Sequence, residues 1–181
     1  SDDAPIIGAE LTSNPIVRKL GFTGSTEVGK LLMKQCASTV TKVSLELGGN
    51  APFLVFEDAD LDAAVEAITL AKFRNSGQTC ISANRLLVHE SVIDEFAEKV
   101  AELARGLKVA PGIEDGSQIG PLIDQQALQK VQNHVSDAAN RGGEILTGGS
   151  IHELGGTFFE PTVITGVPAD SQMACEETFG P

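Results

Sequence analysis

The sequence predicts an α/β fold. Two observations indicate this fold class: short apolar segments alternate with longer segments of helical periodicity, and several of the apolar segments run directly into glycines or acidic turns. The chain has 181 residues, of which 41% are hydrophobic, with 19 glycines and 8 prolines. That length and composition suffice for one hydrophobic core, or for one domain and part of another.

The N-terminal part of the chain contains two predicted strands with a helix between them. Residues 17–24 (VRKLGFTG) are typical of a strand that ends in a glycine turn, and residues 42–49 (KVSLELGG) of a strand that ends in paired glycines. Residues 25–38 have helical spacing, and Ser25 is placed to cap this helix. One face of the helix is expected to carry Val28, Leu31, Leu32 and Gln35.

The next segments again give a strand, a helix and a strand. A buried strand is expected over Pro52–Phe56, followed by an acidic turn and a helix from about Asp60. The apolar face of that helix is formed by Leu61, Ala64, Val65, Ile68 and Ala71. A polar loop then leads into a strand over residues 85–89 and an amphipathic helix over residues 91–107.

Glycines and prolines organise the rest of the chain. Residues 110–123 carry too many of them for a helix or a strand and are predicted to form a loop. A helix is expected over residues 124–141, a short strand over 142–149 and a longer strand over 157–167. The sequence contains no internal repeat and no low-complexity segment.

The charge of the chain disfavours two classes of partner. The net charge is −12, from 25 acidic and 13 basic residues, and no basic stripe interleaved with aromatic residues is present. Binding to nucleic acid or to an anionic membrane surface is therefore not expected. No apolar run approaches the roughly 20 residues that span a bilayer, and the N-terminal sequence lacks the pattern of a signal peptide. We expect a soluble, cytoplasmic protein.

The cysteines and histidines indicate neither a disulfide framework nor a metal site. The three cysteines are an odd number without metal-ligand spacing, and the three histidines are scattered. A reducing compartment and no bound metal are expected. A free cysteine is usually a small buried hydrophobic residue, and we assign Cys36 and Cys175 to this class.

Cys80 lies in a different context, because it follows the polar, glycine-containing segment NSGQT between a helix end and a strand start. Loops of this kind often hold exposed reactive groups. The thiol is either a nucleophile or an inert loop thiol, and the first role requires surroundings that activate it, since a cysteine of ordinary pKa is mostly protonated at neutral pH.

The segment FTGSTEVG also allows two interpretations. A strand leads into a helix whose first turn has free N–H groups, and Gly24 and Gly29 permit close approach of the backbone, which suits a phosphate. The segment does not have the G-x-G-x-x-G pattern, however, and a Gly–Ser turn before a helix is common architecture.

Four motifs in order along the chain resemble the aldehyde dehydrogenase superfamily: GFTGSTEVGK, LELGG with Glu46, GQTC with Cys80, and EETFGP with Glu177. The spacing is also similar, with 34 residues from Glu46 to Cys80 and 97 from Cys80 to Glu177. Within the superfamily, KFRN, ELGGNAPF and FEDADLD resemble the succinate-semialdehyde dehydrogenases. The resemblance extends over essentially the whole chain.

The resemblance implies oxidation of an aldehyde to a carboxylic acid with NAD or NADP. Cys80 would attack the aldehyde carbon to form a thiohemiacetal, which releases a hydride to the nicotinamide and becomes a thioester. The backbone N–H of Cys80 and an asparagine upstream of these residues would stabilise the alkoxide. Glu46 would activate the water that hydrolyses the thioester. Without the resemblance, Glu46 is a solvated carboxylate at a strand end.

The resemblance also implies a set of cofactor-binding residues at three points of the chain: Gly24, Ser25 and Gly29; Leu47 and Gly48; Glu177 and Phe179. The first group would meet the pyrophosphate at a helix N-terminus, with Gly29 allowing close packing. The second would lie near the nicotinamide. In the third, the carboxylate would accept hydrogen bonds from the nicotinamide ribose and the aromatic ring would pack beside it.

The role of Arg74 concerns the class of substrate. An arginine at a helix end commonly contacts the terminal carbonyls. In succinate-semialdehyde dehydrogenases, the arginine six residues before the nucleophile helps to bind the distant carboxylate of the substrate, which a guanidinium grips with two hydrogen bonds. Succinate semialdehyde carries such a carboxylate and fits this role of Arg74. Glutarate semialdehyde would bind through the same charge. Ser82 is a departure, because many members of this subfamily have a second cysteine there.

The resemblance further implies how the chain is organised. Residues 1–47 are expected to be the end of a Rossmann-type dinucleotide-binding domain, and residues 48–181 most of an α/β catalytic domain truncated at its C-terminus. A full-length enzyme is expected to be a homo-oligomer. The alternative is a non-catalytic α/β fragment or assembly module, inactive as an isolated chain, whether a natural short protein or a truncated one.

Overall fold

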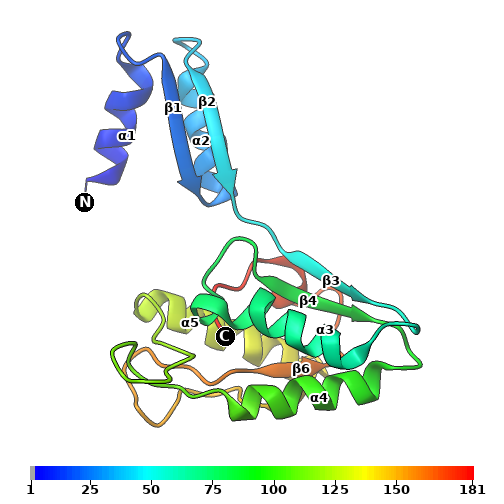
Figure 1. Ribbon diagram of the computed structural model, residues 1–181. Coiled ribbons are helices and arrows are strands. Elements are labelled where there is room, and N and C mark those ends of the chain that lie inside the picture. The colour runs from blue at the N-terminus through cyan, green and yellow to red at the C-terminus, as the bar shows by residue number, and fades with distance from the viewer. Residues whose placement is uncertain (1–2) are drawn as a thin grey trace. The chain divides into compact units, whose positions relative to one another are not determined.

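A computed structural model describes residues 3–181, and these form two compact units, one up to Gly48 and one from Gly49 onward. The first unit contains α1 (Ala4–Ser13), β1 (Lys19–Gly24), α2 (Thr26–Cys36) and β2 (Lys42–Leu47) (Figure 1). Strands β1 and β2 are parallel, with Lys19 opposite Lys42 and Gly24 opposite Leu47. Helix α2 is therefore the crossover of a βαβ motif, as the sequence predicts for an α/β fold. Helix α1 was not among the predicted elements.

Glycine determines which face of α2 is buried. The buried residues of α2 are Gly29, Leu32 and Cys36, whereas Val28 and Leu31 are exposed, so the predicted face was wrong at these last two residues. A Cβ on Gly29 would lie 2.6 Å from Cδ2 of Leu47. The missing side chain lets α2 lie directly against β2, and this orientation leaves Val28 and Leu31 on the exposed side of the helix.

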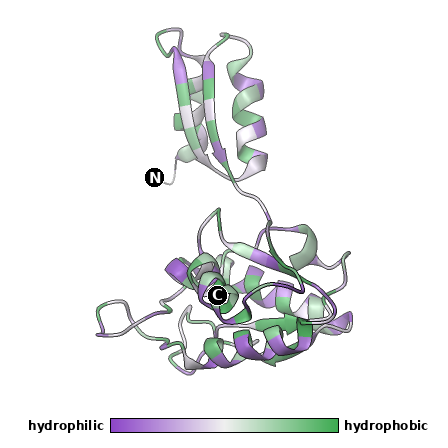
Figure 2. Ribbon diagram, turned by 45° about the vertical axis from the view of Figure 1, so that its right-hand side comes forward, coloured by the Kyte–Doolittle hydropathy of each residue, from purple (hydrophilic) through white to green (hydrophobic). Residues whose placement is uncertain are grey.

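The second unit contains two pairs of strands and the helices that pack on them. Its elements are β3 (Ala51–Val55), α3 (Leu61–Ile68), β4 (Ala83–Val88), α4 (Ile93–Gly106), α5 (Gln125–Asn140), β5 (Glu144–Thr147), β6 (Val163–Thr165) and α6 (Gln172–Cys175). Strands β3 and β4 are parallel, and β5 and β6 are antiparallel. Figure 2 shows hydrophobic and hydrophilic residues alternating along the helices of this unit, which is typical of amphipathic helices.

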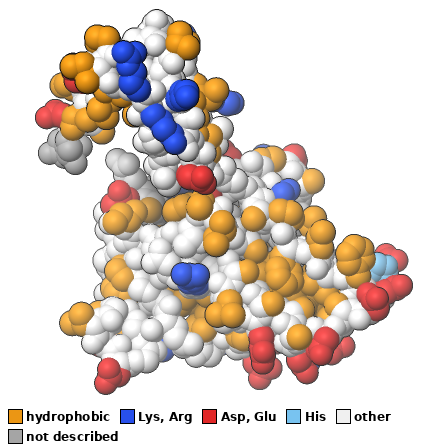
Figure 3. Space-filling view, turned by 45° about the horizontal axis from the view of Figure 1, so that its top comes forward, with side chains coloured by type: hydrophobic (Ala, Val, Ile, Leu, Met, Phe, Trp, Pro, Cys, Tyr) orange, Lys and Arg blue, Asp and Glu red, His pale blue; other side chains and the backbone are white. Residues whose placement is uncertain are grey.

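The main core of this unit lies between the β3–β4 pair and helices α3 and α4. Its buried residues are Val55, Val65, Ile68, Ala83, Phe96 and Val100, and Leu61, Ala64 and Ala71 pack against them, which confirms the predicted face of α3. On the opposite face of the strands, Leu54 and Leu87 lie opposite each other and are exposed. Figure 3 shows hydrophobic side chains gathered on a surface of this unit.

The predicted strand over residues 157–167 is mostly wrong, because only Val163–Thr165 pairs with β5. Residues 148 and 149, which follow β5, are glycines with positive φ, and the backbone leaves the ladder there. Pro161 has no N–H to donate, and upstream of it a single bridge joins Phe159 to Ile151. Among the residues that the structure describes, no helix is long and apolar enough to cross a membrane.

Candidate active site

Cys80 is an exposed free thiol in the loop before β4, as the sequence predicts, and Cys36 is buried. The prediction for Cys175 was wrong, because this thiol is exposed and its Sγ lies 3.4 Å from the carbonyl oxygen of Ala169. Helix α6 has only four residues, none of them buried, so it offers no core to receive the side chain. In residues 3–181, no group of three or more His, Cys, Asp and Glu residues could hold a metal ion.

The chain reaches Cys80 through irregular backbone. Helix α3 ends at Ile68 and passes into a π-helical turn, Thr69–Phe73. Asn75, Ser76 and Gly77 then all adopt positive φ, at 53°, 57° and 71°. This conformation costs energy for residues other than glycine, and together with π-helical turns it is concentrated at functional sites. Contacts with other segments must therefore hold the loop in place.

Residues 120–123 form one of these supports. The backbone N–H of Gly120 donates to Oγ of Ser76 at 2.8 Å, and that of Ile123 donates to Oε1 of Gln78 at 2.9 Å. Nε2 of Gln78 donates to the carbonyl of Pro121 at 3.2 Å. Residues 110–123 form a loop, as the sequence predicts, but their role in supporting Cys80 was not predicted. The triplet NSG is a turn signal, but nothing in it identifies the partner segment.

Gly77 and Gly180 bring together the loop that contains Cys80, here called the cysteine loop, and the EETFGP segment. A Cβ on Gly77 would lie 2.0 Å from the carbonyl oxygen of Gly180, and one on Gly180 would lie 2.6 Å from Cγ2 of Val131. The missing side chain of Gly77 allows this close approach of backbone, and that of Gly180 lets the EETFGP segment pack against Val131 of α5. The loop of Cys80 therefore packs on the segment that contains Glu177 and Phe179.

The carboxylate of Glu177 is held at the start of the second unit. Its Oε1 accepts a hydrogen bond from the backbone N–H of Gly49 at 3.2 Å. Gly49 directly follows Leu47 and Gly48 in the chain. Asn50 adds a second connection, since its Nδ2 donates to the carbonyls of Met173 and Ala174 at 3.2 and 3.0 Å.

Lys72 and Asn84 close the base of the cysteine loop. Nζ of Lys72 donates to Oδ1 of Asn84 at 2.7 Å, and Oγ of Ser82 donates to the carbonyl of Lys72 at 3.4 Å. Burial lowers the pKa of Lys72 to about 8. This pair was not predicted, because no sequence pattern relates residues on either side of a loop of unknown shape.

The lowered pKa of Lys72 predicts a pH dependence of stability. Between about pH 8 and 10.5, folded Lys72 has released its proton while unfolded Lys72 still holds it, so the free energy of unfolding rises with pH through this window. The gain is at most about 3 kcal/mol. In Lys72→Met the rise should be smaller by this amount, as measured by urea unfolding at pH 7.5 and 10. Equal rises in both proteins would contradict the prediction.

Arg74 is exposed at the end of the π-helical turn. Within the described part of the chain, its guanidinium forms no hydrogen bond and no ion pair, and so it does not contact terminal carbonyls of the helix. The guanidinium is available for an external anion.

In the first unit, five of the predicted cofactor residues lie at the same edge of the βαβ motif: Gly24, Ser25, Gly29, Leu47 and Gly48. Oγ of Ser25 caps α2 by accepting from the N–H of Val28 at 3.3 Å. The N–H of Gly48 donates to the carbonyl of Gly24 at 3.3 Å. This edge offers the N-terminus of α2 and a turn without a side chain at Gly24, which fits a pyrophosphate. Glu46 is exposed on β2 in this unit, whereas Cys80 belongs to the second unit.

Comparison with known proteins identifies the class. The model of the aldehyde dehydrogenase family matches residues 2–181, so the chain belongs to this family. It is 56% identical over 178 residues to a succinate-semialdehyde dehydrogenase (NADP(+)) of Escherichia coli, covering 98% of this chain and 37% of that protein. It is 58% identical over 175 residues to a 3-sulfolactaldehyde dehydrogenase of Pseudomonas putida, covering 97% and 36%.

The crystal structure of a succinate-semialdehyde dehydrogenase from Burkholderia pseudomallei has the same fold. The TM-score is 0.97 at 59% identity, covering 99% of this chain and 37% of that one. The α/β fold of an aldehyde dehydrogenase, predicted from the sequence, is thereby confirmed. The chain spans a little over a third of the length of these relatives, 36 to 37%.

Proposed function

We propose that the protein oxidises an aldehyde to a carboxylic acid with NAD or NADP, and that its substrate is a semialdehyde with a distant carboxylate, succinate semialdehyde in the first place. The main support is the exposed thiol of Cys80 in a strained loop that packs, through Gly77 and Gly180, on the segment of Glu177. The free guanidinium of Arg74, six residues before Cys80, supports an anionic substrate.

In the proposed reaction, the Cys80 thiolate forms a carbon–sulfur bond with the aldehyde carbon, and the carbonyl oxygen becomes an alkoxide that accepts a hydrogen bond from the Cys80 backbone N–H. The bound nicotinamide cofactor supplies the acceptor for the hydride that leaves this carbon, which turns the adduct into a thioester. Glu46 then takes a proton from a water molecule, whose oxygen attacks the thioester. The carbon–sulfur bond breaks, and the acid and the thiolate are released.

In this proposal, some of the cofactor-binding residues belong to the first unit and others to the second. Gly24 and Ser25 bind the pyrophosphate at the N-terminus of α2, and Gly29 lets the helix pack on β2. Leu47 and Gly48 would lie beside the nicotinamide. Glu177 would accept hydrogen bonds from the ribose hydroxyls, and Phe179 would pack next to it.

We also propose that residues 1–47 are the end of a dinucleotide-binding domain and that residues 48–181 are most of a catalytic domain. The compact unit that ends at Gly48 supports this division. For the complete protein we propose a homo-oligomer in the cytoplasm, with a small semialdehyde as substrate and no nucleic-acid or membrane partner.

Arg74→Ala tests the substrate class. In the complete protein, loss of two charge-assisted hydrogen bonds should cost about 2–4 kcal/mol of transition-state binding, or roughly 30- to 1000-fold in kcat/KM for succinate semialdehyde. Butyraldehyde lacks the carboxylate, so its kcat/KM should change little. The measurement is kcat/KM for both aldehydes in wild type and variant.

The matched control is Arg105→Ala, which removes another exposed arginine whose ion pair with Glu98 lies on α4. It should leave the preference for succinate semialdehyde intact. A parallel loss for both aldehydes in Arg74→Ala would contradict the carboxylate-binding role and favour a role of Arg74 in stability alone.

A further inference from the structure

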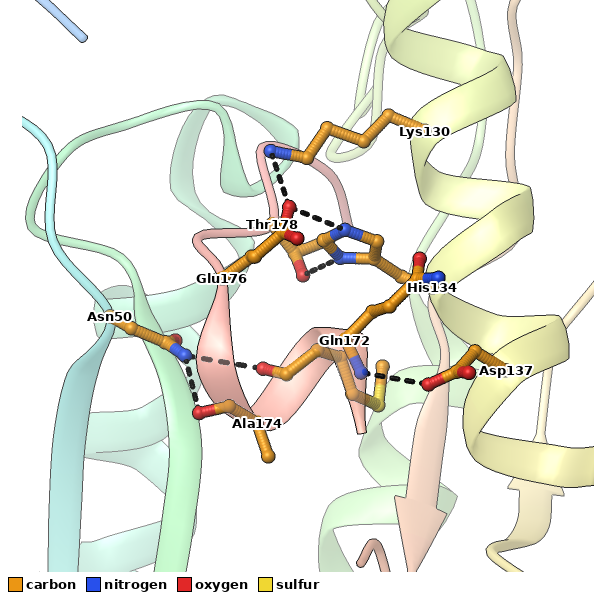
Figure 4. A network of polar contacts seen from close by, with 9 residues as sticks. Asn50, Lys130, His134, Asp137, Gln172, Ala174, Glu176 and Thr178 are labelled. Carbon is orange, nitrogen blue, oxygen red and sulfur yellow. Dashed lines mark hydrogen bonds and ion pairs between the residues drawn. The ribbon is translucent and has the colours of Figure 1, made fainter. Parts of the chain in front are cut away.

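One face of α5 contacts the segment that contains Glu177 (Figure 4). Lys130, His134 and Asp137 are three or four residues apart and therefore lie on the same side of the helix. Oδ2 of Asp137 accepts from the backbone N–H of Gln172 at 2.7 Å, which fixes the start of α6. None of these three side chains had a role assigned from the sequence.

His134 is the buried centre of these contacts, with 2% of its surface exposed. Its Nδ1 lies 2.8 Å from Oγ1 of Thr178, and its Nε2 lies 3.6 Å from Oε2 of Glu176. Nζ of Lys130 lies 3.8 Å from the same carboxylate oxygen. Burial, with the neighbouring charge of Lys130, lowers the pKa of His134, which favours the neutral ring.

The neighbours determine which nitrogen of the ring carries the proton. A neutral imidazole has one N–H donor and one acceptor nitrogen, and an ionised carboxylate only accepts. The Glu176 carboxylate, 3.6 Å from Nε2, favours the tautomer that carries the proton on Nε2. In this tautomer Nδ1 accepts the hydroxyl proton of Thr178, and this hydrogen bond fixes the orientation of the Thr178 side chain.

Glu177 lies between two residues that α5 anchors. Glu176 on one side faces Lys130, and Thr178 on the other side is bound to His134. With both neighbours fixed, the backbone of Glu177 has little freedom, and its carboxylate reaches the N–H of Gly49. A carboxylate that binds a ligand must be held in place by supporting contacts of this kind.

We propose that His134 is a positioning residue which, through Thr178, fixes the Glu177 carboxylate for the ribose of the cofactor. This inference rests on the proposed function for the ligand of Glu177. His134 touches neither substrate nor cofactor and acts only through the segment that it anchors.

Substitutions of Thr178 separate this role from simple packing. Thr178→Val keeps the shape and removes the hydroxyl, whereas Thr178→Ser keeps the hydroxyl. In the complete protein, loss of this one hydrogen bond should weaken binding of NAD or NADP about tenfold in Thr178→Val, with a smaller effect on kcat at saturating cofactor. Thr178→Ser should bind the cofactor about as tightly as wild type does.

Substitutions of His134 test which nitrogen matters. An asparagine amide can occupy the place of Nδ1 and a glutamine amide that of Nε2. His134→Asn should therefore retain more cofactor affinity than His134→Gln. Equal affinities of these two variants would contradict the role assigned to Nδ1.

Hydrogen exchange gives a readout that does not depend on activity. Backbone amides of residues 176–180, followed by mass spectrometry, should exchange faster in Thr178→Val than in Thr178→Ser. Equal exchange would overturn the anchoring, and faster exchange with unchanged cofactor affinity would overturn the positioning of Glu177. Failure of the wild type to bind either cofactor would instead refute the proposed function and with it the assigned ligand, while the exchange comparison would still decide the anchoring.

Discussion

Cys80→Ala should abolish aldehyde oxidation in the complete protein, with a loss of kcat of roughly 1000-fold or more. Without the thiol no covalent adduct forms, and an aldehyde carbon that stays trigonal has no hydride to release. Because the thiol is exposed and the loop is held by Ser76, Gln78 and Gly77, the substitution should leave the fold and cofactor binding intact. The measurement is the rate of NADH or NADPH formation by absorbance.

Cys175→Ala is the matched control, since this thiol is also exposed but lies on α6 and has no place in the proposed reaction. It should retain activity close to wild type. Turnover by Cys80→Ala at a rate similar to wild type, or loss of turnover in Cys175→Ala, would contradict the assignment of the nucleophile.

Gly77→Ala should destabilise the protein by roughly 3 kcal/mol. Alanine at a φ of 71° is strained, and its Cβ would lie 2.0 Å from the carbonyl oxygen of Gly180, so one of the two backbone segments has to move. The strain costs about 1 kcal/mol and the overpacking a further 1–3 kcal/mol. Urea unfolding measures the change in the free energy of unfolding.

Gly116→Ala separates the two contributions. Gly116 has a φ of 76°, but nothing lies within 4 Å of a Cβ placed on it, so this variant should lose only about 1 kcal/mol, from the strain. Equal losses in the two variants would show that the close approach of Gly77 to Gly180 does not matter for stability.

The sequence predicts the fold class well because the βαβ order and the apolar face of α3 are local patterns. It also predicts the exposed position of Cys80, since polar turn residues surround it. The predicted face of α2 was wrong for a physical reason: a contact between Gly29 and Leu47 decides the orientation of the helix, and periodicity gives a glycine no weight. The prediction that Cys175 is buried was also wrong, because α6 is too short to have a buried face.

The contacts that build the candidate site could not be predicted from the sequence. Ser76 and Gly120 are 44 residues apart in the chain, as are His134 and Thr178. The close approach of Gly77 to Gly180 joins residues still further apart. Such contacts depend on where the backbone of the folded chain runs, and that path cannot be read from residue types and their spacing in a single sequence.

Trapping the thioester in Glu46→Gln tests the central claim most directly. In the complete protein, this variant should carry out the first hydride transfer and then stall, because no base activates the water. After reaction with succinate semialdehyde and NAD or NADP, acid quenching and digestion, mass spectrometry should find a succinyl thioester on the peptide that contains Cys80. The double variant Glu46→Gln, Cys80→Ala should carry none. A succinyl group on Cys36 or Cys175 instead, or unaltered steady-state turnover by Glu46→Gln, would contradict the account.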